Sequence, residues 1–179
     1  MNVSDSRMAN RLTQQLMKVI QADTTSTRGQ RNVIDGEATL LTGFEFNQNG
    51  RLDKTFFAPY TPTIDRASGT LSVSIPEFVP ATMIGSPPGS THFRLVSGAA
   101  EVDFEKGTYV ASTSQSGDTL LAPVPLPAQL LTQVVTPAST KPLFLALGIE
   151  FFQEVNGVLY PLRNGAFNAL MIAAVDGGV

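Results

Sequence analysis

The residue types that carry out acid–base or nucleophilic chemistry are scarce in this chain. His92 is the only histidine among 179 residues, and there is no cysteine. A serine triad would have to run through His92, and the Gly-x-Ser-x-Gly turn that presents many serine nucleophiles is absent. The glycine-rich dinucleotide and phosphate-binding motifs are absent as well. We therefore expect no catalytic, cofactor-binding or metal-binding residues and a protein that is not an enzyme.

The charged residues near His92 have a simple structural interpretation. Thr91–Val96 and Glu101–Glu105 are predicted to form a hairpin around the loop Ser97–Ala100. The apolar side chains then face the core, and the outward cross-strand pairs are Arg94 with Asp103 and His92 with Glu105. Such pairs contribute about 0.2–1 kcal/mol each without any ligand.

The same acidic residues offer a weaker alternative, a calcium-type site formed by Glu101, Asp103 and Glu105. Residues two apart on a strand are roughly 6.5–7 Å apart. This spacing is too wide for one ion without further ligands from a loop. The cross-strand pairs are therefore the preferred interpretation.

A cluster of aromatic residues offers a candidate ligand surface. Phe56, Phe57 and Tyr60 lie close together before two prolines. In a lectin-like sandwich such rings stack on a sugar, so a carbohydrate is one candidate partner. Aromatic residues at this density also occur in cores and interfaces, which leaves that alternative open.

The N-terminal residues 1–22 are predicted to form an amphipathic helix that begins at Ser4 or Asp5. Its apolar residues recur at helical spacing: Met8, Leu12, Leu16 and Val19. An isolated helix of this length is marginal, so its apolar face must pack on something. That surface is either the sheet of the same chain or another copy, and we expect it to mediate self-association.

The rest of the chain has the pattern of an antiparallel β-sandwich, jelly-roll or immunoglobulin-like, with about ten short strands. Residues 23–35 are predicted to be a linker and residues 36–179 the β-sandwich domain. Period-two alternation predicts a strand over residues 38–46, a hairpin turn at Asn47–Gly50 and a second strand from Arg51. The segment Leu143–Phe152 is apolar on both faces, which predicts a central strand covered on both sides.

The composition limits the classes of partner that we expect the protein to bind. The formal net charge is −3 and only 15% of residues are charged, so the basic surface typical of nucleic-acid binders is not expected. The longest apolar stretch is far shorter than the roughly 20 residues of a membrane-spanning helix. The N-terminus has charges where a secretion signal is apolar. We expect a protein of the cytoplasm or of an assembled particle.

Several segments suggest a family resemblance. They are Arg28–Val33, Gly43–Asn47, Thr91–Phe93, and Gly148–Phe151 followed by Asn156–Gly157 and Asn164–Leu170. Together they resemble an uncharacterised family of small proteins from Bacteroidetes-type bacteria, over most of the chain from Arg28 onward. The resemblance implies no activity and no site residue.

The sequence therefore favours a non-catalytic structural or interaction protein. We expect it to self-associate into a homo-oligomer or a larger assembly such as a capsid, sheath or filament. The alternative is a carbohydrate- or ligand-binding lectin-like β-sandwich that uses Phe56, Phe57 and Tyr60.

Overall fold

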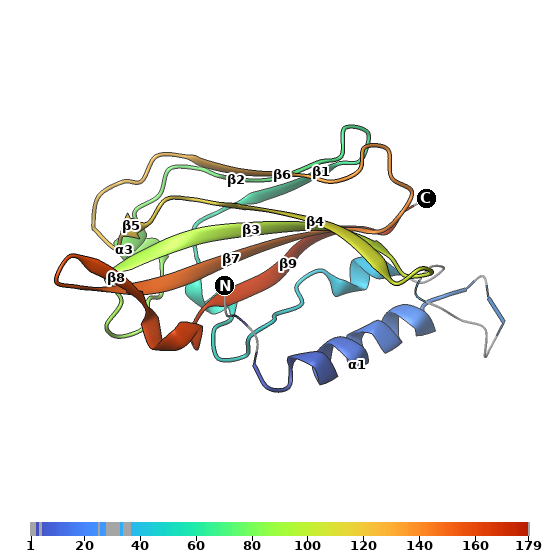
Figure 1. Cartoon of the computed structure of the whole chain (residues 1–179), viewed down its shortest axis with the longest axis horizontal. Coiled ribbons are helices and arrows are strands. Elements are labelled where there is room, and N and C mark those ends of the chain that lie inside the picture. Colours follow the sequence, from blue (N-terminus) through green and yellow to red (C-terminus); the bar gives the residue numbers. More distant parts are fainter. Residues whose placement is uncertain (1–2, 4, 25, 28–32, 34–36, 179) are drawn as a thin grey trace.

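The computed structural model describes residues 3, 5–24, 26–27, 33 and 37–178. Within these ranges the chain forms nine strands in two antiparallel sheets, with one long helix near the N-terminus (Figure 1). The helical elements are α1 (Met8–Gln21), η1 (Ala38–Leu41), α2 (Leu52–Thr55), α3 (Pro80–Met83) and η2 (Leu162–Gly165). The strands are β1 (Thr61–Asp65), β2 (Thr70–Ile75), β3 (His92–Asp103), β4 (Thr108–Gln115), β5 (Thr119–Leu120), β6 (Gln129–Val134), β7 (Leu143–Val155), β8 (Val158–Pro161) and β9 (Ala169–Asp176).

The two sheets face each other across one core. The small sheet has the order β1-β2-β6, and the large sheet has the order β4-β3-β7-β8, with β5 beside β3 and β9 beside β7. The prediction of a mainly antiparallel, sandwich-like β protein is confirmed, with nine strands within the described residues rather than about ten.

Strand β7 is the centre of the large sheet, as its apolar sequence predicts. It pairs with β3 on one side and with β8 and β9 on the other. One face of β7 is fully buried against side chains of the small sheet such as Leu71 and Val73. The residues of this face are Leu143, Leu145, Leu147, Ile149 and Phe151. The opposite face, which includes Phe144, points towards the N-terminal layer.

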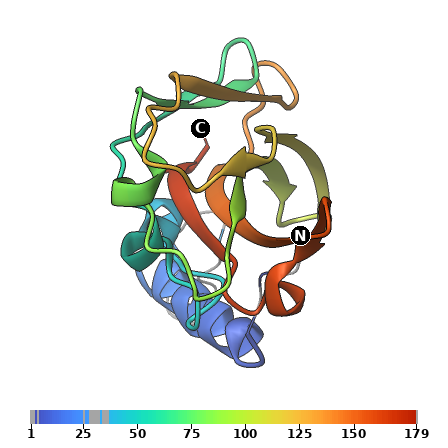
Figure 2. The same cartoon turned by 90° about the vertical axis from the view of Figure 1, so that its left-hand side faces the viewer.

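Helix α1 packs within its own chain, on the outer face of the large sheet. Val19 is 0% exposed and forms a second apolar cluster with Leu41 of η1 and Ile172 of β9. Leu12 and Leu16 pack against this cluster. Figure 2 shows α1 below the sheets as a separate layer. Most of the linker expected at residues 23–35 lies outside the described residues.

The strand expected over residues 38–46 and the hairpin at Asn47–Gly50 are wrong. Residues 38–41 form the short helix η1, and Asn47 does not turn the chain back on itself but donates from its side chain to the carbonyl oxygens of Ala166 and Asn168. A Cβ on Gly50 would lie only 2.5 Å from the carbonyl oxygen of Phe167. Asn47 and Gly50 therefore serve close packing between distant segments. The strand expected from Arg51 is replaced by α2.

The hairpin expected around Ser97–Ala100 is also wrong. β3 runs without a break through these residues and pairs with β4 on one edge and β7 on the other. The Ser97 hydroxyl donates to the carbonyl oxygen of Ala146 on the neighbouring strand. Small residues in this chain thus allow close contact along a long strand instead of marking a turn.

Candidate binding groove

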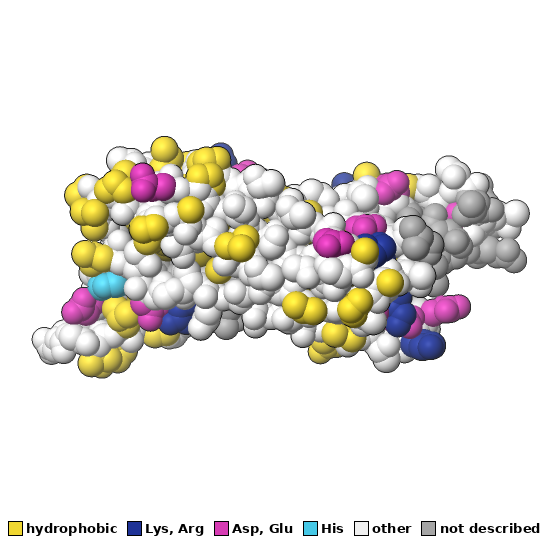
Figure 3. Space-filling view, turned by 90° about the horizontal axis from the view of Figure 1, so that it is seen from above, with side chains coloured by type: hydrophobic (Ala, Val, Ile, Leu, Met, Phe, Trp, Pro, Cys, Tyr) yellow, Lys and Arg dark blue, Asp and Glu magenta, His cyan; other side chains and the backbone are white. Residues whose placement is uncertain are grey.

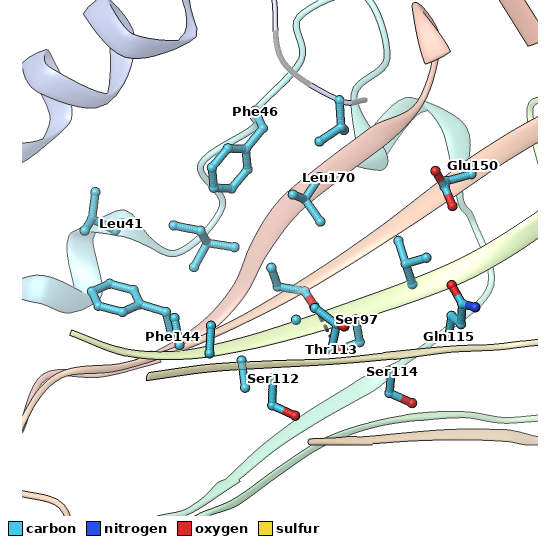
Figure 4. Close-up of a pocket in the computed structure, with 18 of the residues that line it drawn as sticks. Leu41, Phe46, Ser97, Ser112, Thr113, Ser114, Gln115, Phe144, Glu150 and Leu170 are labelled. Carbon is cyan, nitrogen blue, oxygen red and sulfur yellow. Dashed lines mark hydrogen bonds between the residues drawn. The ribbon is translucent and has the colours of Figure 1, made fainter. Parts of the chain in front are cut away.

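A groove of about 1100 Å³ lies between the outer face of the large sheet and the N-terminal layer. Figure 4 shows Leu41 and Phe46 on one side of it and β4 residues, such as Thr113, on the other. Small-molecule sites in proteins have volumes of roughly 300–1,000 Å³. The groove is therefore large enough for an extended ligand.

The floor of the groove is made of small and aliphatic side chains. Successive side chains of a strand point to opposite faces, and the odd-numbered residues of β3 are buried in the core. The even-numbered residues therefore face the groove: Val96, Gly98, Ala100 and Val102. A Cβ on Gly98 would meet only the methyl group of Thr113, at 3.9 Å. The groove is therefore deep because the side chains of this floor are small.

The wall opposite β4 is formed by α1, η1 and the segment that follows η1. Arg11 of α1 fixes this wall: its guanidinium donates to the carbonyl oxygens of Glu45 (2.6 Å) and Phe46 (3.2 Å) and pairs with Asp5. These bonds lock the helix to the loop that carries Phe46. The wall is therefore a fixed part of the fold.

Glu45 holds the same loop from inside the protein. Its side-chain oxygens accept a hydrogen bond from the backbone N–H of Leu52, at 2.9 and 3.0 Å, and Glu45 is 5% exposed. Burial raises the pKa of Glu45, although the N–H groups of Leu52 and Asp53 act in the opposite direction. This carboxyl group therefore ties the groove wall to the start of α2.

Polar groups gather at one end of the groove. The Arg94 guanidinium lies 2.7 Å from Asp118, 3.8 Å from Glu150 and 4.9 Å from the centroid of the Phe152 ring. Glu150 and Gln115 lie at this end in Figure 4, and Phe144 lies at the other. The groove therefore has one end lined by Phe144 and another lined by the Arg94 guanidinium and the Glu150 carboxylate, with Asp118 beside Arg94.

His92, Arg94 and the acidic residues of β3 have other partners than the sequence predicted. His92 is 3.8 Å from Glu154 and not paired with Glu105, and Arg94 pairs with Asp118 and Glu150, not with Asp103. Glu101 and Asp103 are instead 3.7 and 3.1 Å from the Lys141 ammonium group. In the part of the chain that the structure describes, no three potential metal ligands converge.

The Lys141 contacts predict how stability depends on acidity. Burial raises the pKa of Glu101, but hydrogen bonds from Thr136 and Ser139 and the Lys141 charge bring it below its ordinary value. Hydrogen bonds from Lys106 and Lys141 lower the pKa of Asp103.

Carboxyl groups whose pKa values are lowered by folding stabilise the fold at pH values above their unfolded pKa values. This contribution is lost as the pH falls through their folded pKa values. Lys141→Met should therefore lower the urea midpoint at neutral pH and leave it nearly unchanged in acid; an equal loss at both would contradict this.

The predicted aromatic cluster does not form one exposed surface. Phe56 is 4% exposed and packs edge-on against Phe78 in the core, with the ring centroids 5.5 Å apart. Tyr60 is partly buried against the same core, and Phe57 is 55% exposed. Only Phe57 thus presents its ring fully to a ligand from outside.

The predicted self-association residues lie on α1, and most of them are occupied within the chain. Leu12, Leu16 and Val19 pack against the sheet and its flanking segment, and Met8 is partly exposed. Leu12 and Leu16 also line the groove. Sequence reasoning missed the groove itself. The available signal is the run of small residues Ser97–Ala100 within β3, a composition that is also typical of a loop.

Among the described residues, no helix is both long and apolar enough to cross a membrane.

No family model and no curated protein matches the chain. One similar solved structure comes from work on pH-induced modulation of Streptococcus parasanguinis adhesion by Fap1 fimbriae. It is 11% identical, covers 64% of this chain and 79% of that chain, and has a TM-score of 0.27. Another is the human F-spondin reeler domain, 13% identical, covering 70% of this chain and 95% of that chain at a TM-score of 0.26. TM-scores this low do not assign a shared fold.

Proposed function

We propose that this chain is a non-catalytic binding protein whose groove takes an elongated amphiphile, with an alkyl tail and a head group that donates hydrogen bonds. The observation that carries the proposal is the groove itself, which is lined mainly by apolar side chains and has Arg94 and Glu150 at one end. Burial of an alkyl chain contributes about 0.8 kcal/mol per CH₂ group. A tail lying along Val96, Ala100 and Phe144 therefore gains this contribution for each CH₂ group that it buries.

The polar end indicates the chemistry of the head group. Among the described residues that line the groove, Arg94 is the only cation, and it already contacts Asp118 and the Phe152 ring. The Glu150 side chain is 13% exposed, and its carboxylate lies 3.8 Å from the Arg94 guanidinium. Its carboxylate is therefore placed to accept hydrogen bonds from a ligand. An amine fits best, an alcohol fits less well, and a carboxylate is repelled.

Calorimetric titration with decylamine, decanol and decanoate, each below its micelle concentration, tests the proposal. We expect the affinities to fall in that order. Glu150→Gln should weaken decylamine binding about tenfold, equivalent to about 1.4 kcal/mol, and leave decanol binding unchanged. Binding of none of the three probes, or preference for decanoate, would refute the proposed ligand class.

Filling the floor of the groove should remove binding without harming the fold. Gly98→Leu adds an apolar side chain where only Thr113 is within 4 Å, so we expect at least about a tenfold loss of decylamine affinity. A glycine within a strand is unfavourable by roughly 0.5–1 kcal/mol, so the variant should be at least as stable as the wild type in urea. Gly117→Leu is the matched control, because a Cβ there meets nothing within 4 Å. If Gly98→Leu bound decylamine with unchanged affinity, the ligand would bind outside this groove.

The self-association expected from the sequence stays a prediction, as does a jelly-roll or immunoglobulin-like topology. The helix face first expected to mediate contact between copies is used within the chain. A contact between copies therefore needs another surface. The aromatic lectin surface is less favoured than the groove, because Phe56 lies in the core.

A further inference from the structure

Strand β4 is an edge of the large sheet that lacks the usual protection. Among the described residues it pairs with β3 alone. Its eight residues, Thr108–Gln115, include no charged residue and no proline, and Tyr109 is 75% exposed. Natural edge strands are usually protected by lysine, proline or a covering segment, because a bare edge pairs with another chain.

The other edges mostly carry such protection. β1 contains Pro62, and β8 is short and ends at Pro161. The free edge of β9 is covered by the segment after η1, because Gly43 and Phe46 donate backbone hydrogen bonds to Ile172 and Leu170. β6 and β5 also lack charge and proline, but they have only six and two residues. Figure 3 shows that the middle of the face seen from above also carries few charged side chains.

The register fixes which backbone groups of β4 point outward. Ser116 N–H donates to Leu95 O, and Val102 N–H donates to Pro142 on the β7 side. Because a strand alternates the direction of its backbone groups, odd-numbered residues of β3 bond towards β4. Their partners in β4 are even-numbered, since Ala99 pairs with Ser112. The backbone groups left on the free edge belong to Tyr109, Ala111, Thr113 and Gln115.

We propose that β4 pairs with β4 of a second copy, antiparallel about a two-fold axis, with Ser112 opposite Ser112. In this register Tyr109 is opposite the partner's Gln115, and Ala111 is opposite the partner's Thr113. Every outward N–H and C=O of both strands is then used in a hydrogen-bonded pair. The same patch serves both copies, so the contact closes as a dimer.

This pairing also joins the two grooves. Side chains opposite each other across antiparallel strands lie on the same face. Residues Tyr109, Ala111, Thr113 and Gln115 oppose groove-facing residues of β3, so in the dimer they form one strip of uncharged side chains that continues into the partner's groove. The inference does not depend on the amphiphile proposal, because it rests only on backbone groups and register.

Disulfide cross-linking tests the register directly, because the chain has no cysteine. Opposed residues of a non-hydrogen-bonded antiparallel pair have Cα atoms about 4.5 Å apart, within the range for a disulfide. Ser112→Cys should therefore form a covalent dimer under mild oxidation. Val110→Cys alone and Ser114→Cys alone should not, because each thiol is four residues, about 13 Å, from its own copy. A mixture of those two variants should cross-link.

Light scattering over a concentration series provides the second measurement. Wild-type protein should have the mass of two chains, and Thr113→Pro or Thr113→Lys should have the mass of one, with unchanged circular dichroism. Thr132→Pro on β6 is the matched edge control and should stay dimeric. A wild-type monomer at every concentration, a dimer lost only in Thr132→Pro, or a dimer without Ser112→Cys cross-links would each overturn the proposal.

Discussion

Replacing Glu45 by alanine should lower the free energy of unfolding by about 2–4 kcal/mol. The variant leaves the buried N–H of Leu52 without its acceptor and opens a cavity where the carboxyl group was. The loop that carries Phe46 also loses its anchor to α2, so we expect decylamine affinity to fall as well. Urea unfolding at neutral pH measures the first effect, and calorimetry measures the second.

Glu45→Gln separates the charge of this group from its hydrogen bond. An amide oxygen still accepts from Leu52, so the loss should be smaller, about 1 kcal/mol. Burial raises the pKa of Glu45 in the folded chain. A group whose pKa is raised in the folded chain contributes its full stabilisation at pH values below its unfolded pKa. This contribution is lost as the pH rises through the folded pKa. Wild type should therefore lose stability relative to Glu45→Gln as the pH rises above about 4.3, the pKa of an unfolded glutamate. A constant difference would show that Glu45 has an ordinary pKa.

The parts of the fold that follow from side-chain periodicity were predictable. The apolar run Leu143–Phe152 predicted β7, and helical spacing predicted α1. In each case a buried face is repeated over enough residues to outweigh local preferences. The apolar character of both faces of β7 also predicted its central position between two layers.

The errors share a physical cause. Ser97–Ala100 and Asn47–Gly50 have the composition of turns, yet both are used where two backbones approach closely. Local sequence cannot distinguish a small residue that allows a turn from one that makes room for a neighbouring strand. The neighbour, such as Ala146 beside Ser97, lies far away in the sequence.

The groove was not predictable for the same reason. Its floor comes from β3, β4 and β7, and its wall comes from α1 and the segment after it. The polar end joins Arg94 to Asp118 and Glu150 across separate strands. Each segment alone has an ordinary pattern, and the cavity exists only because the helix lies over part of the sheet and leaves the rest uncovered.

Replacing Val19 by aspartate should destabilise the chain by about 3 kcal/mol or more, because it buries a charge without a partner. Val19 is 0% exposed between Leu41 and Ile172, and the buried Asp23 lies one turn further along the chain. Like charges at this spacing add repulsion. The groove wall should loosen with the helix, so decylamine affinity should fall together with stability.

The control is Met17→Asp, two residues away on the same helix, where the side chain is 48% exposed. Substitutions at such surface positions usually change stability by less than about 0.5 kcal/mol. Urea unfolding and light scattering of both variants distinguish the two roles of α1. A helix that packs within its own chain makes Val19→Asp unstable and leaves β4-mediated dimers intact. If Val19→Asp instead kept full stability and lost only the dimer, α1 would be the contact between copies, as the sequence first suggested.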